Sequence, residues 1–185
     1  QYNIGWLLPY ARQGIPIVGC EPSCVSALTD DYVDLLPGTE SKLVSSHTFM
    51  IEELLLQEEG HLSFTDGSKD ILLHSHCHQR ALVGTKPSAQ LLDLPPNYRV
   101  EVIDSSCCGM AGSFGYETEH YDLSMKIGEL RLFDRIRSYS PNRGEGVEVA
   151  VSGVSCREQI KHGTGREPRH LIELLREAIP LPQQN

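Results

Sequence analysis

Cysteines and the residues beside them are the side chains in this sequence best suited to metal or redox chemistry. The 185-residue chain has six of them. Two, Cys107 and Cys108, are adjacent and are followed by a glycine-rich stretch over 109–115. The others lie in three short segments, which are GCEPSC with Cys20 and Cys24, HSHCHQ with Cys77, and SGVSC with Cys156. Clustered cysteines of this kind indicate metal binding or redox chemistry more than a disulfide framework.

The spacing of the cysteines favours an iron–sulfur cluster over a single zinc ion. Thiolates are soft ligands that select zinc or iron–sulfur clusters, and structural zinc sites usually contain a C-x-x-C pair, which this chain lacks. Adjacent cysteines cannot easily place both sulfurs on one tetrahedral ion, but they can ligate two metals of a cluster. Zinc bound by cysteine and histidine, and free thiols that are buried or redox-active, stay open as alternatives.

Short apolar runs alternate with helical patterns along the chain. We expect strands over 15–20, 71–76, 98–104 and 147–153. We expect helices over 23–36, 41–59, 78–84, 87–94, 116–139 and 170–179. Strands separated by helices imply parallel pairing with right-handed crossovers. The sequence therefore predicts a three-layer α/β fold with a parallel sheet of about four strands flanked by helices, as one domain over 1–185.

The predicted topology would bring the cysteines to one place. Ligands of parallel sheets bind outside the carboxyl ends of the strands, and the cysteines follow such ends. We therefore expect one metal site formed by the cysteines that follow these ends, which are Cys20 and Cys24, Cys77, Cys107 and Cys108, and Cys156.

Three histidines flank Cys77 and are further candidates. Alternation on a strand would place His74, His76 and His78 on one face and Cys77 on the other. Histidine is a common metal ligand and hydrogen-bond donor, and we count His76 and His78 as additional candidate ligands. The glycines after the cysteine pair follow G-x-x-G-x-x-G, which differs from the G-x-G-x-x-G of dinucleotide-binding sites.

Composition and charge narrow the class of protein. The chain is 39% hydrophobic with a net charge of −9, which is typical of a globular protein and argues against a nucleic-acid partner. No apolar run is long enough for a transmembrane segment, and the start has no features of a signal peptide. Since the chain lacks an initiator Met, we interpret it as a fragment of a longer protein, with processing as the alternative.

Four segments together resemble a known family. CCGMAGSFGYE, HCHQRAL, GCEPSC and SGVSCREQIKHGTGR…HLIELL resemble the cysteine-rich CCG domain. That domain occurs in heterodisulfide reductase, in the iron–sulfur subunits of glycolate oxidase and anaerobic glycerol-3-phosphate dehydrogenase, and in lactate-utilisation proteins. The resemblance covers about 15 to 179 and is greatest to the C-terminal part of fused proteins that carry an FAD-linked oxidase domain.

The resemblance also implies a set of ligands. The family pattern is one Cys, a CC pair and a C-x-x-C, which Cys77, Cys107, Cys108 and Cys156 match in order. The first Cys of the C-x-x-C falls on Gly153, so this chain departs from the pattern there. The resemblance then suggests Cys24 as the replacement ligand and leaves Cys20 as a spare.

The function that the resemblance implies is electron transfer. The chain would be the iron–sulfur module, of the 4Fe-4S type, of a flavin-dependent 2-hydroxy-acid dehydrogenase or related oxidoreductase. FAD would be bound only in the rest of the parent protein. The partners would be its flavin domain, its first iron–sulfur region and a downstream electron acceptor, in the cytoplasm or at the inner face of the membrane. The alternatives are a zinc-stabilised interaction domain and a thiol/disulfide-active module of the heterodisulfide-reductase type. The isolated fragment is expected to have no turnover of its own.

Overall fold

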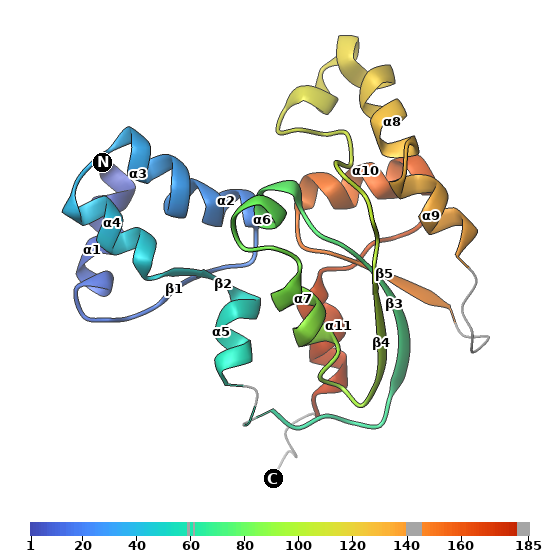
Figure 1. Ribbon diagram of the computed structural model, residues 1–185, viewed down its shortest axis with the longest axis horizontal. Helices are drawn as coiled ribbons and strands as arrows, with labels where there is room; N and C mark the ends of the chain where they lie inside the picture. The colour runs from blue at the N-terminus through green and yellow to red at the C-terminus, as the bar shows by residue number, and fades with distance from the viewer. Residues whose placement is uncertain (59, 61, 140–145, 181–185) are drawn as a thin grey trace.

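The computed structural model describes residues 1–58, 60, 62–139 and 146–180. Its main sheet has three parallel strands in the order β4-β3-β5 (Figure 1). The central strand β3 (Ser68–His74) pairs with β4 (Asn97–Val102) on one side and with β5 (Val147–Val151) on the other. The prediction of a parallel sheet with helical crossovers is confirmed for these strands.

Side chains of the central strand alternate between two hydrophobic cores. Ile71 and Leu73 face the core formed with α7 (Lys86–Leu92) and α11 (Leu171–Ala178). Leu72 faces the opposite core, which includes residues of α9 (Leu132–Ser138) and α10 (Val154–Thr164). Since both faces are covered, β3 has the continuous apolar run typical of a buried parallel strand. Helix α10 is absent from the elements that the sequence pattern predicts.

The prediction of a single four-stranded sheet is wrong. Strand β1 (Ile17–Gly19) pairs in parallel with β2 (Thr48–Met50), and these two strands form a separate sheet. Strand β2 interrupts the helix expected over 41–59, whose last residue lies outside the described residues. The chain instead forms α4 (Thr39–Ser46), β2 and α5 (Ile51–Gln57). The apolar spacing continues across this break, so the helical period alone does not reveal it.

The first part of the chain has its own small core. Helices α1 (Tyr2–Ala11) and α4 pack around Ile4, Leu8, Ala11 and Val44. The segment 23–36 is largely helical as expected, but it does not form one continuous α-helix. It consists of α2 (Pro22–Ser26), a π-helical turn (Ala27–Asp31) and α3 (Tyr32–Leu35). In Figure 1 this helical lobe lies to the left of the main sheet. The single domain over 1–185 stays a prediction.

The long helix expected over 116–139 is divided. Two 3₁₀ turns (Phe114–Tyr116 and Thr118–His120) precede α8 (Tyr121–Glu129), and α9 follows after a bend at Arg131. The bend carries Phe133 into the core, where a Cβ on Gly128 would lie 2.3 Å from its ring. Helices α6 (Cys77–Leu82), α7 and α11 agree with the predicted segments. None of the helices in the described ranges has the length and apolar character needed to span a bilayer.

An ion-pair network joins α11 to the main sheet and predicts a dependence of stability on pH. Glu177 contacts Lys69 at 3.1 Å and Arg169 at 2.5 Å, and both cations also approach Glu148. Hydrogen bonding from Arg169 is the largest cause that lowers the pKa of Glu177 to about 2, and Lys69 lowers it further. Because the folded pKa is depressed, this stabilisation is present above the unfolded pKa of about 4.3 and is lost as the pH falls towards 2.

We therefore expect Glu177→Gln to lower the free energy of unfolding at pH 7 by less than about 1 kcal/mol, because its side chain is 46% exposed and screened by solvent. The difference from the wild-type chain should shrink between about pH 4.3 and pH 2. Urea unfolding at both ends of this range measures it. Glu167→Gln is the control, because its pair with Lys161 is more exposed. A constant Glu177→Gln deficit across the range would contradict the assignment.

Candidate metal centre

Four of the six cysteines lie together at the carboxyl edge of the main sheet. Cys77 begins α6 after β3, Cys107 and Cys108 follow β4, and Cys156 lies in the first turn of α10 after β5. Cys108 and Cys156 are buried, whereas Cys77 and Cys107 are half-buried. Parallel pairing produces this arrangement, because it directs the ends of the strands to the same edge. The role of these residues as ligands stays a prediction.

The four thiols lie close enough to shift one another's pKa values. Hydrogen bonds from Cys108 and then from Cys77 lower the pKa of Cys107 far below its usual range. Donation to Cys107 is the largest cause that raises the pKa of Cys77, and burial adds to it. The same donation raises the pKa of Cys108, which also donates to Cys156. Hydrogen bonding from Cys108 lowers the pKa of Cys156 to about 5, although its burial acts in the opposite direction.

The glycine-rich stretch brings backbone N–H groups close to the Cys107 sulfur. The Gly109 amide donates a hydrogen bond to Cys107 Sγ at 3.2 Å. Gly109 has a φ of 104°, and a Cβ there would lie 2.1 Å from the Ser124 carbonyl oxygen of α8. Only glycine fits both the backbone conformation and the close approach of the helix. The backbone amide of Ala111 also lowers the pKa of Cys107. The turn thus supplies backbone N–H groups that stabilise anionic sulfur.

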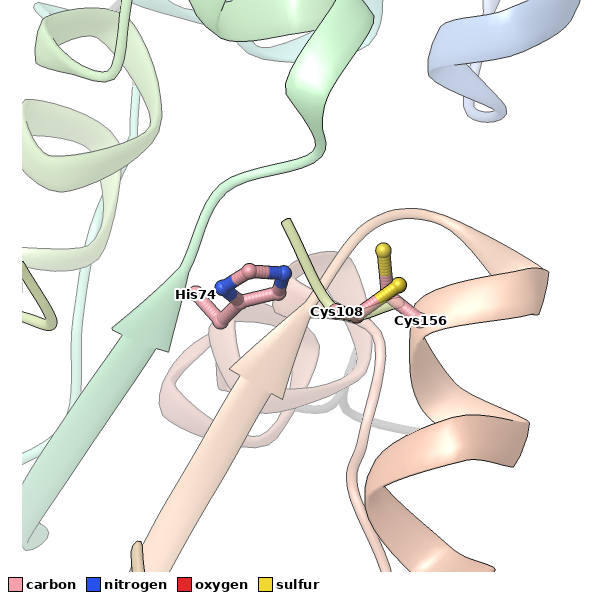
Figure 2. Close-up of side chains that lie close together, drawn as sticks. All are labelled: His74, Cys108 and Cys156. Carbon is pink, nitrogen blue, oxygen red and sulfur yellow. The ribbon is translucent and has the colours of Figure 1, made fainter. Parts of the chain in front are cut away.

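His74, which sequence reasoning left out of the candidate ligands, lies beside the buried cysteines. It is the last residue of β3 and only 1% exposed. Its Nδ1 pairs with Ser105 Oγ at 2.8 Å, and its Nε2 has no hydrogen-bond partner among the described residues. The ligand atoms of His74, Cys108 and Cys156 all lie within 4.8 Å of one another (Figure 2). Its place at the end of a buried strand, on the face shared with His76, is the signal that could have identified it.

His76 occupies the space of the side chain that Gly153 lacks. A Cβ on Gly153 would lie 2.3 Å from Cδ2 of the His76 ring. The backbone of Gly153 is extended and would accept any residue, so the histidine ring is the obstacle to a cysteine there. His76 Nδ1 accepts a hydrogen bond from the His78 amide at 3.2 Å. His78 in turn pairs with Ser26 Oγ at 3.0 Å. The predicted candidates His76 and His78 therefore both lie at the site.

The cysteines open onto a cavity of about 290 Å³. This volume is several times the ~30 Å³ that one water molecule occupies in the liquid. Its lining includes His76, Cys77, His78, Cys108 and Cys156. Glu21 and Ser23 of the helical lobe also line it, and the Glu21 carboxylate accepts a hydrogen bond from the Val154 amide at 2.9 Å. The donor set is soft, largely buried and supplied with backbone N–H groups, so the residues present fit a thiolate-bound metal or cluster.

The structure does not place Cys24 with the other four cysteines. Cys24 is exposed on α2 and lines a different pocket, together with Trp6 and Tyr32. Its neighbour Ser23 lines the cysteine cavity, and consecutive residues of a helix point about 100° apart. Cys20 is also exposed, and its carbonyl accepts a hydrogen bond from His170 at 3.0 Å. Both residues follow β1, which belongs to the separate two-stranded sheet with β2.

Arg80 holds the segment before the cysteine pair. Its guanidinium donates hydrogen bonds to the carbonyl oxygens of Ser105 and Ser106. Because Arg80 lies on α6, these bonds connect the element that carries Cys77 to the loop that carries Cys107. Arg80 therefore fixes the segment that follows β3 against the segment that follows β4.

Comparison with known proteins supports a relation to two kinds of dehydrogenase. The chain is 29% identical over 171 residues to one of the subunits of the anaerobic glycerol-3-phosphate dehydrogenase of Escherichia coli K12, covering 90% of this chain and 41% of that protein. It is 29% identical over 172 residues to the D-2-hydroxyglutarate dehydrogenase of Pantoea ananatis, covering 91% of this chain and 16% of that protein. The Escherichia coli K12 D-2-hydroxyglutarate dehydrogenase is 27% identical over 171 residues, with 91% and 16% covered.

No family model matches the chain. The chain also spans less than half the length of each of these relatives, at 41% and 16%. The resemblance inferred from the motifs is therefore confirmed at the level of distant relatives, and the assignment to the CCG domain stays a prediction. The chain is thus a distant relative of parts of an anaerobic glycerol-3-phosphate dehydrogenase and of D-2-hydroxyglutarate dehydrogenase.

Proposed function

We propose that this chain is the iron–sulfur electron-transfer module of a flavin-dependent 2-hydroxy-acid dehydrogenase or a related oxidoreductase. The observation that carries the proposal is the convergence of four cysteines at one edge of the main sheet, three of which line a single cavity. In this assignment Cys77, Cys107, Cys108 and Cys156 hold the cluster. The relation to two dehydrogenases supports an oxidoreductase as the parent protein.

The cluster, when bound, would supply a one-electron carrier between a two-electron flavin and an acceptor. The residues of this chain hold and shield it. Burial of Cys108 and Cys156 excludes water from one side of the site, and the cavity leaves the other side open for electron exchange. The backbone amide of Gly109 donates to sulfur and so stabilises the more negative, reduced state.

A direct thiol catalyst at this site would have to use Cys107. A reactive cysteine requires a lowered pKa together with exposure to its substrate. Cys156 has a lowered pKa but is buried, and the buried Cys108 has a raised one. The half-buried Cys107 has a lowered pKa, so thiol activity that persists after removal of iron would be assigned to this residue.

The second candidate function is a zinc-stabilised interaction domain. The observation that favours it is the trio of His74, Cys108 and Cys156, whose ligand atoms lie within 4.8 Å of one another. Mixed cysteine and histidine ligands are typical of structural zinc sites. In that case the half-buried Cys77 would complete a tetrahedral shell, and the chain would carry no electrons.

Anaerobic reconstitution distinguishes the two functions. We expect the chain to take up iron and sulfide together, to develop visible absorption and to lose part of that absorption on reduction by dithionite. A parallel sample receives zinc alone, and metal and sulfide contents are measured after desalting. Stoichiometric zinc in the presence of competing iron and sulfide, with no reducible chromophore, would contradict the electron-transfer proposal and support the zinc domain.

The partners in this proposal are other parts of the parent protein. We infer that the flavin domain, a first iron–sulfur region and the FAD lie outside this chain, which spans 16% of the D-2-hydroxyglutarate dehydrogenase that it matches. A downstream acceptor would take the electrons, in the cytoplasm or at the inner face of the membrane. Aerobic purification is expected to remove most of the cluster, because its site opens to the surface through the cavity.

A further inference from the structure

We propose that His74 is a nitrogen ligand of the metal centre and binds through Nε2 to the metal atom held by Cys108 and Cys156. The inference rests on the proposed function in requiring a metal at this site. It goes further in assigning a mixed cysteine and histidine ligand set.

The first step is the unsatisfied nitrogen of His74. The side chain is 1% exposed, and Nε2 has no partner at hydrogen-bond distance and angle among the described residues, although His74 lies near enough to Cys156 to lower the pKa of that thiol. A buried polar atom without a partner is unfavourable by about 1–3 kcal/mol, so such atoms usually have a ligand, an ion or a water beside them. Figure 2 shows one ring nitrogen of His74 directed towards the side where the sulfurs of Cys108 and Cys156 lie.

The second step is the orientation of the ring by Ser105. Nδ1 of His74 lies 2.8 Å from Ser105 Oγ, and Ser105 is buried. When the Nδ1 proton is donated to this hydroxyl, the lone pair is on Nε2, which is the arrangement found in metal-binding histidines. The Arg80 hydrogen bond to the Ser105 carbonyl fixes this partner in place.

The third step is the distance between the donor atoms. In a tetrahedral shell, two thiolates bound at about 2.3 Å to one metal lie about 3.8 Å apart. The ligand atoms of His74, Cys108 and Cys156 lie within 4.8 Å of one another. Movements of less than about 1 Å in their side chains are therefore enough for all three to bind the same atom.

The neighbouring histidines, His76 and His78, do not combine burial with a ring nitrogen that is free to bind a metal. Nδ1 of His76 accepts the His78 amide, so the proton of the neutral ring lies on Nε2, which can donate to sulfur but cannot bind a metal. His78 lies on α6, is exposed and has its Nδ1 paired with Ser26. Gly153 has no side chain and Cys24 lines another pocket, so neither position supplies a further ligand to the site.

The test is pulsed electron paramagnetic resonance of the anaerobically reconstituted and reduced chain, with histidine labelled with ¹⁵N. We expect a strong nitrogen coupling that changes with the label and is lost in His74→Gln. His76→Gln and His78→Gln should retain it. Iron and sulfide are measured in every sample. A wild-type cluster without histidine nitrogen coupling, or a coupling that persists in a loaded His74→Gln variant, would overturn the inference and leave the proposed function intact.

A second measurement keeps the test independent of the cluster. Cobalt(II) alone is added to the wild-type chain and to His74→Gln under anaerobic conditions, and its ligands are determined by X-ray absorption. A shell of sulfur with one imidazole nitrogen is expected in the wild-type chain, and a shell without that nitrogen in His74→Gln. A shell of sulfur alone in the wild-type chain would overturn the role of His74. Cobalt bound with this shell, but no uptake of iron and sulfide, would contradict the electron-transfer function while supporting the ligand assignment.

Discussion

Replacement of Cys108 with serine is expected to remove nearly all iron and sulfide from the anaerobically reconstituted chain. Cys108 is 3% exposed and lies beside Cys107 and Cys156, both of which raise the pKa of its thiol. Serine is a hard oxygen donor with little affinity for iron in a thiolate site. Loss of a ligand should weaken metal binding by more than the ~10–100-fold that follows from loss of a ligand's hydrogen-bond partner. Iron and sulfide per chain, with circular dichroism as the check on folding, measure the effect.

Cys24→Ser is the matched control for Cys108→Ser. Cys24 is exposed and lines the pocket with Trp6 and Tyr32, so the variant should retain the metal of the wild-type chain. Cys20→Ser should behave in the same way, because Cys20 is also exposed. If Cys24→Ser loses iron and Cys108→Ser retains it, the ligand set derived from this structure is wrong and the role suggested by the family pattern for Cys24 is restored.

Gly109→Ala is expected to cause the largest loss of stability of any single methyl addition considered for this chain. The residue has a φ of 104°, where side chains are strained, and the new Cβ would lie 2.1 Å from the Ser124 carbonyl oxygen. Backbone strain and overpacking each cost about 1–3 kcal/mol, so we expect a loss of about 3 kcal/mol or more. Urea unfolding of the metal-free chain measures it. Since α8 must move away, the position of Cys107 and Cys108 should change and iron uptake should fall as well.

Gly112→Ala and Gly5→Ala are the controls for this prediction. Gly112 has a φ of +69° but open space around it, so alanine should cost only the ~1–2 kcal/mol of a left-handed conformation. Gly5 lies within α1 with nothing near its Cβ position, so alanine should be neutral or stabilise by about 0.5–1 kcal/mol. If Gly109→Ala costs no more than Gly112→Ala, the close approach of α8 to the turn is not what requires glycine there.

The main sheet could be predicted from the sequence because local patterns determine it. The run with Ile71, Leu72 and Leu73 is apolar on both faces, which is typical of a central parallel strand. The separate pairing of β1 with β2 could not be predicted, because it depends on a contact between distant segments, with Ile17 beside Thr48. Apolar residues at helical spacing continue through β2, so the period favoured one long helix where the structure has a strand between two short ones.

The residue types and spacing of the cysteines by themselves determined that the chain carries soft thiol donors after its strands. Parallel topology then placed Cys77, Cys107, Cys108 and Cys156 at one edge of the sheet, as expected. Only the tertiary structure decided that Cys24 faces another pocket. Strand β1 belongs to the separate sheet with β2, so the residues that follow β1 do not reach the carboxyl edge of the main sheet in the same way as the other cysteines. Only the tertiary structure singled out His74, because a sequence shows three similar histidines but not which ring nitrogen is left without a partner when the strands and loops pack.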